Sequence, residues 1–287
     1  MIITRIQGGL GNQMFQYAIA RSLALKNNDQ LKLDDSFFLT QTLREYQLNQ
    51  FNIIEDFASK SEIYKLRGIE GFIYKIFKKL GFKYSRPSSY IEDKSSTIYQ
   101  EEIFNLRKDD IYLSGFWQNE KYFSSIKKSI VDDFMPKNEI SETATKYLEK
   151  IKNSNSISLH VRRGDYVNDA NATHGLCDIN YYKRALNFIK KNIKNANVFI
   201  FSDDITWCKN EFAFLKDSYF IHDTKSEVED LTLMKNCKHN IIANSTFSWW
   251  GAWLNQNPDK VIITPKYWYA RNDWKNKHPA PSNWLRM

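Results

Sequence analysis

The chain has 287 residues, of which 42% are hydrophobic and 15% aromatic, and its formal net charge is +8. So much apolar side chain can bury a sizeable core, which excludes a disordered chain. The positive charge indicates an anionic partner such as a nucleotide, a phosphorylated lipid, a membrane surface or nucleic acid. The length allows one large domain or two of about 140 residues each.

The cysteines and the apolar runs exclude several other classes of protein. Cys177, Cys208 and Cys237 show no CxxC spacing, so the chain has neither a disulfide framework nor a zinc-site pattern. Free cysteines are typical of a reducing, cytosolic setting. No run of 18 apolar residues and no secretory signal occur, so we expect a cytoplasmic protein without a membrane-spanning helix.

The N-terminus predicts a strand, a glycine turn and a helix. Ile2–Ile6 is the strand, residues 7–13 form the turn, and Met14–Leu25 shows helical spacing. Leu31–Asp34 completes a βαβ unit. A helix start after a glycine turn can bind an anion, because free N–H groups point out of it. The turn lacks the GxGxxG and Walker patterns, so a simple tight turn is the alternative.

Residues 37–110 show few clear secondary-structure patterns. An apolar stripe at helical spacing from Ile69 to Leu80, with lysines around it up to Lys83, predicts a basic amphipathic helix. It can lie on an anionic membrane or pack on the core with a solvated face. Ser85–Thr97 is typical of a loop.

The stretch that follows predicts a strand over 111–118, a helix over Glu120–Ile130 and a domain boundary at Met135–Asn138. Trp117 lies at the end of this strand. It suits either a sugar-binding platform or the protein core.

The second half alternates short apolar strands with helices. The predicted strands are Ser156–Val161, Val198–Phe201, Tyr219–Ile221, Asn240–Ala243 and Val261–Ile263. The predicted helices are Ser141–Ile151, Asn180–Asn192, Ile205–Phe214, Glu227–Cys237 and Phe247–Leu254. This alternation predicts a parallel sheet covered on both faces. We therefore expect an α/β protein with two Rossmann-like domains, residues 1–137 and 138–287, whose parallel sheets face each other across a ligand-binding cleft.

Polar residues follow four of the predicted strands in the second half. They are Arg162, Arg163 and Asp165 after one strand, Ser202, Asp203 and Asp204 after another, Asn244 to Ser248 after a third, and Thr264 to Lys266 after the last. The carboxyl ends of parallel strands meet at one edge of a sheet, which is where such folds bind ligands. Arginine grips a diphosphate well, since its planar fork donates two parallel hydrogen bonds.

Several of these side chains have two possible roles. Ser245 and Thr246 lie at a helix start, where one is expected to cap the helix and the surrounding groups suit a phosphate. Asp203 and Asp204 could hold Mg²⁺, but no third carboxylate is near and the arginines supply positive charge, so we expect no metal. Asp230 or Asp203 could accept hydrogen bonds from the edge of guanine, or Asp230 could be a solvated helix carboxylate.

Four stretches together resemble bacterial α-1,2-fucosyltransferases, glycosyltransferase family 11. They are Gly8–Ala18 (GGLGNQMFQYA), His160–Tyr166 (HVRRGDY), Phe201–Asp204 (FSDD) and Asn244–Ala252 (NSTFSWWGA). The resemblance covers almost the full length. It implies a GT-B fold, GDP-β-L-fucose as donor and inversion to an α-linked product. It also implies a β-galactoside acceptor in a surface glycan or oligosaccharide, and no metal or other cofactor.

The resemblance and the strand-end residues predict the same roles. Arg162 should stabilise the charge that grows on the departing β-phosphate. Arg163 should brace the loop or pair with Asp165. Asn12, with Gly9 and Gly11 in residues 1–137, the acceptor side, should reach the diphosphate or the fucose. In residues 138–287 the GDP-fucose site is expected to comprise Arg162, Asp203, Asp230, Asn244, Ser245, Thr246 and Phe247.

The general base stays open at this point. It must be a carboxylate or a histidine near the acceptor hydroxyl, and the candidates are Asp165, His160, Asp34 and Asp35.

A nucleic-acid-binding protein is the main alternative function. Lys260, Lys266 and four further cations lie among Trp268, Trp274 and Trp284 near the C-terminus, a combination that can stack bases. The charge is spread along the chain and the motifs gather at strand ends, so we expect no nucleic acid as partner. Another sugar donor or another linkage is the second alternative.

Overall fold

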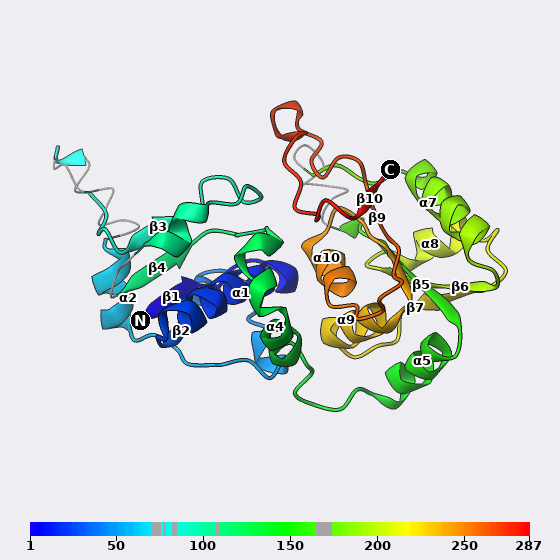
Figure 1. Ribbon diagram of the computed structural model, residues 1–287, viewed down its shortest axis with the longest axis horizontal. Coiled ribbons are helices and arrows are strands. Elements are labelled where there is room, and N and C mark those ends of the chain that lie inside the picture. The colour runs from blue at the N-terminus through cyan, green and yellow to red at the C-terminus, as the bar shows by residue number, and fades with distance from the viewer. Residues whose placement is uncertain (70–75, 77–78, 82–84, 107–109, 165–173) are drawn as a thin grey trace. The chain divides into compact units, whose positions relative to one another are not determined.

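The computed structural model describes the whole chain except residues 70–75, 77–78, 82–84, 107–109 and 165–173. The chain divides into two compact units, Met1–Met135 and Pro136–Met287. Both are α/β units built on a parallel sheet, as predicted (Figure 1).

The first unit contains a four-stranded sheet with the order β2-β1-β4-β3. All its neighbouring strands pair in parallel. The strands are β1 (Ile2–Arg5), β2 (Leu31–Asp34), β3 (Tyr90–Glu92) and β4 (Ile111–Ser114). Strand β3 lies within the segment predicted as a loop. With three residues, this strand is too short and too exposed to show an alternating pattern of apolar and polar residues.

Helix α1 (Leu10–Asn27) begins four residues before the predicted start. Gly9 has an extended backbone and precedes the helix, so Gly11 and Asn12 belong to the first turn and not to a glycine loop. Two buried glutamines of this helix hold the turn. The Gln13 amide donates to the carbonyl oxygens of Gly8 and Glu45, and the Gln16 side chain accepts from the N–H of Gln7.

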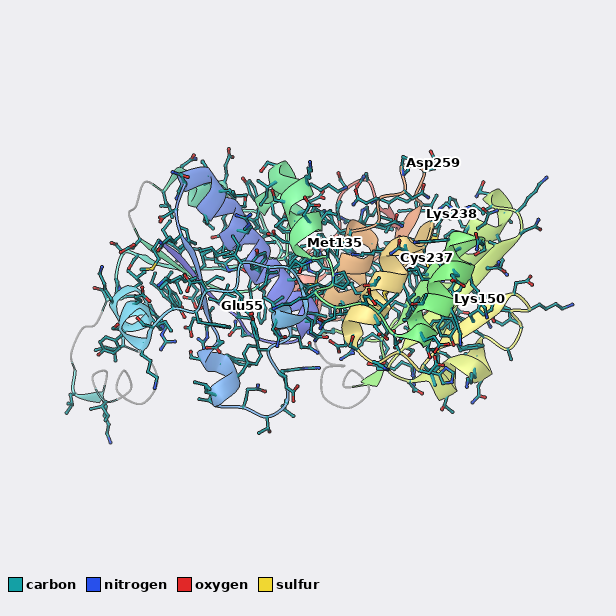
Figure 2. The ribbon with its side chains drawn as sticks, turned by 90° about the horizontal axis from the view of Figure 1, so that it is seen from below. Glu55, Met135, Lys150, Cys237, Lys238 and Asp259 are labelled. Carbon is teal, nitrogen blue, oxygen red and sulfur yellow. The ribbon has the colours of Figure 1, made fainter. Side chains whose placement is uncertain are left out.

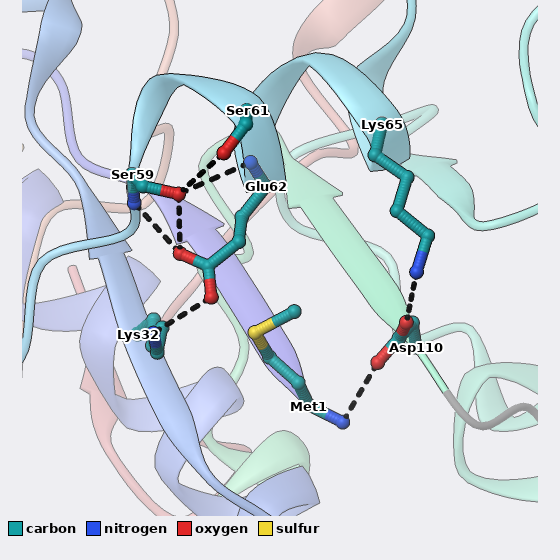
Figure 3. Close-up of polar contacts among 7 residues, drawn as sticks. All are labelled: Met1, Lys32, Ser59, Ser61, Glu62, Lys65 and Asp110. Carbon is teal, nitrogen blue, oxygen red and sulfur yellow. Dashed lines mark hydrogen bonds and ion pairs between the residues drawn. The ribbon is translucent and has the colours of Figure 1, made fainter.

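Helix α2 (Lys60–Arg67) starts with a capping box, which Figure 3 shows. The N–H of Glu62 donates to Ser59 Oγ, and the Glu62 carboxylate accepts from the N–H of Ser59 at 2.7 Å. The same carboxylate pairs with Lys32 of β2 at 2.8 Å, which ties the helix to the sheet. Asp110, just before β4, pairs with the N-terminal amine of Met1 at 3.2 Å (Figure 3).

Short helical turns fill much of the remainder of the first unit. They are η1 (Ser36–Leu39), η2 (Leu48–Gln50), η3 (Glu101–Asn105), η4 (Glu120–Tyr122) and η5 (Ser124–Ile126), followed by α4 (Lys127–Asp133). The single helix predicted over Glu120–Ile130 is therefore wrong. Phe123 has φ −143°, which interrupts the helical path between the two turns.

Trp117 belongs to the core of the first unit. Its side chain is fully buried and packs edge-on against Tyr122. The turn before it is held by Asp93, whose carboxylate accepts from the N–H groups of Phe116 and Trp117. The possibility that Trp117 forms an exposed sugar platform is wrong.

The second unit contains a six-stranded parallel sheet with the order β10-β9-β8-β5-β6-β7. The strands are β5 (Asn155–Val161), β6 (Ala196–Ser202), β7 (Ser218–Ile221), β8 (His239–Ile241), β9 (Ile262–Thr264) and β10 (Leu285–Arg286). β5 pairs with β6 over seven residues and with β8 on its other side. Lys238 and Asp259, labelled in Figure 2, precede β8 and β9 at the amino-terminal edge.

Helices cover both faces of this sheet, as Figure 1 shows. One face packs against α7 (Ile179–Asn192) and α8 (Ile205–Glu211) through residues such as Leu159 and Ile200. The other packs against α5 (Glu142–Lys152) and α9 (Glu227–Asn236) through Phe199 and Phe201. Alternate residues of one strand thus serve opposite faces. Helix α10 (Thr246–Trp253) and the turn η6 (Asn272–Trp274) complete the unit.

The predicted basic amphipathic helix lies mostly outside the described residues. Of the stretch 70–83, the structure describes Ile76 and residues 79–81. None of the helices in the described ranges is long and apolar enough to cross a bilayer.

Candidate functional site

Arg162 and Asp203 form an ion pair at the carboxyl ends of the neighbouring strands β5 and β6. Arg162 Nη1 lies 2.9 Å from Asp203 Oδ2, and about a quarter of each side chain is exposed. The other oxygen of Asp203 accepts from the backbone N–H of Arg163 at 2.8 Å. Asp203 therefore holds both the side chain of Arg162 and the backbone that follows it.

Gly164 leaves the room that this ion pair needs. A Cβ atom at this position would lie 2.6 Å from Asp203 Oδ2, well inside the contact distance. The glycine of the RRGD stretch thus permits the close approach of the aspartate.

Arg163 is held by the neighbouring strand end and not placed towards the site. Its Nε donates to Asp204 Oδ2 at 3.1 Å, and its guanidinium lies 4.2 Å from the centre of the Trp207 ring. Asp204 also caps α8, because its Oδ1 accepts from the N–H of Trp207. A bracing role for Arg163 fits this geometry, with Asp204 as partner.

His160 is buried one residue before the end of β5, with 5% of its surface exposed. Burial, helped by the charge of Arg162, lowers the pKa of His160 to about 3. Its ring lies beside Phe247, and its Nδ1 has no hydrogen-bond partner among the residues that the structure describes. An imidazole with so low a pKa is a weak proton acceptor at neutral pH.

Asn244 ties two loops together at the carboxyl end of β8. Its side-chain amide donates to the carbonyl oxygens of His174, Gly175 and Trp268 at 2.8–3.2 Å. Only 3% of the residue is exposed. Its side chain therefore shapes the site by holding these loops.

The start of α10 presents backbone N–H groups at the same edge. Ser245 occupies the N-cap position, yet its side chain makes no capping hydrogen bond, contrary to the expectation that one of the two hydroxyl residues caps the helix. Thr246 and Phe247 form the first turn and are partly exposed. N–H groups in the first turn of a helix suit a phosphate oxygen.

Asp230 lies in the first turn of α9, and its carboxylate accepts a hydrogen bond from the Thr224 hydroxyl at 2.8 Å. Burial raises the pKa of Asp230 to about 6. The group is thus not the freely solvated helix carboxylate considered as its alternative role. A partly buried carboxylate with one protein partner can accept further hydrogen bonds from a ligand.

The predicted site residues of the first unit lie at the start of α1. Asn12 is partly exposed, and its side-chain oxygen accepts from the Gln118 amide at 2.9 Å. A Cβ atom on Gly9 would meet nothing within 4 Å, whereas Gly11 is buried.

Asp34 is fully buried in the first unit, which rules out its proposed role as general base. Its carboxylate accepts from the Tyr112 hydroxyl and the N–H of Ser36, and it pairs with Arg67 at 3.3 Å. Asp35 is partly exposed. Asp165 lies outside the described residues.

A pocket of about 290 Å³ lies at the carboxyl edge of β8 and β9 in the second unit. Its lining includes Cys177, Arg184, Asn244, Lys266, Tyr267 and Tyr269. Among the residues with described positions, no three His, Cys, Asp or Glu side chains are grouped so that they could hold a metal ion. Asp203 and Asp204 face arginines.

The residues that support the two arginines carry little signal in the sequence. Trp207, for example, has no role in the sequence analysis. The one available signal is its position three residues after Asp204, which caps the helix and brings Trp207 close to Arg163. The fit of Gly164 against Asp203 depends on the register between β5 and β6, which no local pattern gives.

Comparison with known proteins gives the chain its relatives. The model of glycosyl transferase family 11 matches residues 1–287. The chain is 38% identical to an alpha-1,2-colitosyltransferase of Escherichia coli, covering 100% of this chain and 99% of that protein. It is 35% identical to the O-antigen biosynthesis glycosyltransferase WbnK of Escherichia coli, covering 98% and 99%.

A solved structure shares the fold. A mutant of Arabidopsis thaliana FUT1 in complex with GDP superposes with a TM-score of 0.53 at 10% identity, covering 93% of this chain and 70% of that one. Such low identity makes this a similarity of fold alone.

Proposed function

The chain belongs to glycosyl transferase family 11, and we propose that it transfers L-fucose from GDP-β-L-fucose to the 2-hydroxyl of a β-galactoside in a surface glycan, with inversion and without a metal ion. One observation carries the proposal. Arg162 is positioned by Asp203 at the carboxyl end of a central parallel strand, where α/β sheets bind ligands.

The proposed reaction is a single displacement at the anomeric carbon. The acceptor hydroxyl loses its proton to a general base, for which Asp35 and Asp165 are the remaining candidates. Its oxygen forms the new bond to the anomeric carbon while the bond to the β-phosphate oxygen breaks, and negative charge grows on the departing diphosphate. A fixed guanidinium stabilises that charge without reorganising during the reaction. Arg162 is the residue placed for this role.

The two arginines and two aspartates together carry no net charge, so the diphosphate needs further donors. The uncapped start of α10 supplies backbone N–H groups at Thr246 and Phe247, and Asn12 is proposed to add an amide. Asp230 is proposed to accept hydrogen bonds from the N1 and N2 groups of guanine. Asp203 uses both oxygens within the protein, which favours a positioning role over base recognition.

The donor sugar has a second candidate. The 38% identity to an alpha-1,2-colitosyltransferase supports GDP-colitose as the alternative donor, with the same linkage. Colitose is L-fucose without the 3-hydroxyl group. A site that hydrogen-bonds this hydroxyl would reject colitose strongly, whereas an apolar site would discriminate weakly.

A direct assay distinguishes the donors. The full chain is given GDP-fucose or GDP-colitose with a panel of β-galactosides in the presence of EDTA, and the linkage of the product is determined by NMR. We expect the higher kcat/KM with GDP-fucose and an α-1,2 product. A higher value with GDP-colitose would select the alternative donor, and an absolute requirement for Mg²⁺ would refute the arginine-centred mechanism.

A further inference from the structure

The segment Pro265–Lys277 forms an exposed basic surface at the carboxyl edge of the second unit's sheet. It follows β9, includes the turn η6 and extends away from the sheet as the orange-red excursion in Figure 1. Lys266, Arg271 and Lys275 are exposed, and Lys277 is half-buried. The segment contains four basic residues, one acidic residue, Asp273, and no histidine, so the net charge of the segment is +3.

Two aromatic side chains of this segment are held among its cations. Tyr267 is 49% exposed, and its ring centre lies 5.3 Å from Lys266 Nζ and 5.7 Å from Lys275 Nζ. Trp274 has Arg271 at 4.8 Å and Lys277 at 4.5 Å. Trp274 also packs edge-on against the buried Tyr269, which anchors it to the unit.

We propose that this basic aromatic segment docks the protein on the surface of an anionic phospholipid bilayer. Lysine and arginine near such a surface are attracted to its headgroups, and each of them strengthens binding several-fold. Tyrosine and tryptophan prefer the zone between headgroups and acyl chains, because one part of each ring system is apolar and another is polar.

The same residues fit nucleic acid less well. Stacking of bases requires free ring faces in a row. Trp268 and Trp284, which the sequence places among these cations, are 2% and 7% exposed and belong to the core. The rings of Tyr267 and Trp274 already lie against cations. A bilayer needs no such row of free faces, since it is contacted by the cations and the ring edges together.

The test uses the full chain and vesicle flotation. Wild-type protein is mixed with vesicles of phosphatidylcholine alone or of phosphatidylcholine with phosphatidylglycerol, at low and at physiological ionic strength. We expect binding to the anionic vesicles that weakens as salt rises. The variant K266E/K275E should bind at least roughly 30-fold more weakly, because two attractive charges become repulsive.

A matched control changes the same charges elsewhere. Lys194 and Lys216 are exposed and precede β6 and β7, at the opposite edge of the same sheet. The variant K194E/K216E should keep most of the vesicle binding. The variant Tyr267→Ser should bind more weakly than wild type even at high salt, since the contribution of an aromatic ring is not screened.

Several results would overturn the proposal. One is the absence of binding to anionic vesicles by the wild-type chain. Another is an equal loss of binding in K266E/K275E and K194E/K216E, which would indicate a general charge effect. A third is displacement from the vesicles by RNA at low concentration at physiological salt, which would make nucleic acid the preferred partner.

Discussion

At the scale of single residues, the proposed transfer reaction depends on how firmly Arg162 is held. Its pairing with Asp203 fixes the guanidinium at the strand end. For Arg162→Ala we expect kcat to fall on the order of 10²–10³-fold, because one donor to the departing phosphate is lost. Arg163→Ala should cost mainly stability, since Arg163 contacts Asp204 and Trp207. Steady-state kinetics and thermal melting of both variants separate these effects, and near-normal turnover of Arg162→Ala would contradict the mechanism.

Gly164→Ala tests the same ion pair without touching either charge. The added Cβ would lie 2.6 Å from Asp203 Oδ2, so the aspartate or the loop must move and Arg162 would lose its position. We expect kcat to fall at least about 10-fold, since a misplacement of about 1 Å can cost 10²-fold, while circular dichroism stays native. Unchanged kcat would show that the position of Asp203 is not needed.

Asp230 should make GDP binding depend on pH. Burial raises its pKa to about 6, so in the free protein it is mostly protonated below pH 6 and ionised above. Only the ionised carboxylate can accept from both guanine N–H groups. We therefore expect the Kd for GDP, measured by calorimetry, to fall as the pH rises from 5 to 7.5.

The variant Asp230→Asn is the control for this pH dependence. In this variant the nucleotide phosphate still titrates but the side chain at position 230 does not. Any pH dependence of the Kd that remains therefore comes from GDP. Linkage gives a second readout with a defined sign. A carboxyl whose pKa is raised on folding destabilises the protein as the pH rises from about 4 to 6. The apo variant should therefore melt higher than wild type at pH 7 and equally at pH 4.

At the scale of elements, Glu229 joins two helices of the second unit. Its Oε1 accepts from the N–H of Ser141, the N-cap of α5, and its Oε2 accepts from the Ser141 hydroxyl and the N–H of Lys225. Burial alone would raise the pKa of Glu229, but the hydrogen bonds from Lys225 and Ser141 hold it below its usual range. The carboxylate thus links the starts of α5 and α9.

Glu229→Gln should lower the free energy of unfolding by about 1–3 kcal/mol at pH 7, because an amide NH₂ would face an N–H donor. A carboxyl with a lowered pKa stabilises the fold above its unfolded pKa, and this contribution is lost as the pH falls through the folded value. The difference in the free energy of unfolding between Glu229→Gln and wild type should therefore become smaller at acidic pH. The exposed Glu227, in the same helical turn, provides Glu227→Gln as control, and equal urea melts for both variants would contradict this role.

The strands of the second unit could be predicted because a parallel sheet covered on both faces makes them apolar runs between helices. Ser156–Val161 and Val198–Phe201 were expected, and β5 and β6 contain both. The two-residue β10 has exposed side chains and no such signal. The predicted start of the helix at Met14 is wrong because Gly11 and Asn12 are poor helix formers, and buried contacts of Gln13 outweigh that preference in α1.

The candidate site could likewise be predicted only in part, because some of its contacts join residues distant in sequence. Arg162 could be predicted because it follows an apolar strand, but its partner Asp203 lies on another strand and is fixed by the register of β5 with β6. As a carboxylate, Asp34 is a candidate base on sequence alone, but its burial with Arg67 and Tyr112 depends on contacts distant in sequence.

At the scale of the whole molecule, both units are expected to respond to the donor. The proposed GDP contacts are Arg162, Asp230, Thr246 and Phe247 in the second unit, and Asn12 is proposed as a contact in the first. Amide hydrogen exchange of the full chain with and without GDP should show protection at both sets, because bound donor suppresses local opening. Protection confined to the second unit would mean that Asn12 does not reach the diphosphate.

The central position of β5 also bears on how the protein is made. One edge of β5 pairs with β6, which leaves the ribosome soon after it, but the other edge pairs with β8, nearly 80 residues later. At 5–20 residues per second, that edge waits roughly 4 to 16 s for its partner. During this interval an apolar strand with open hydrogen-bonding groups is a target for aggregation. Slow synthesis of the chain, or its truncation before His239, should therefore yield insoluble protein.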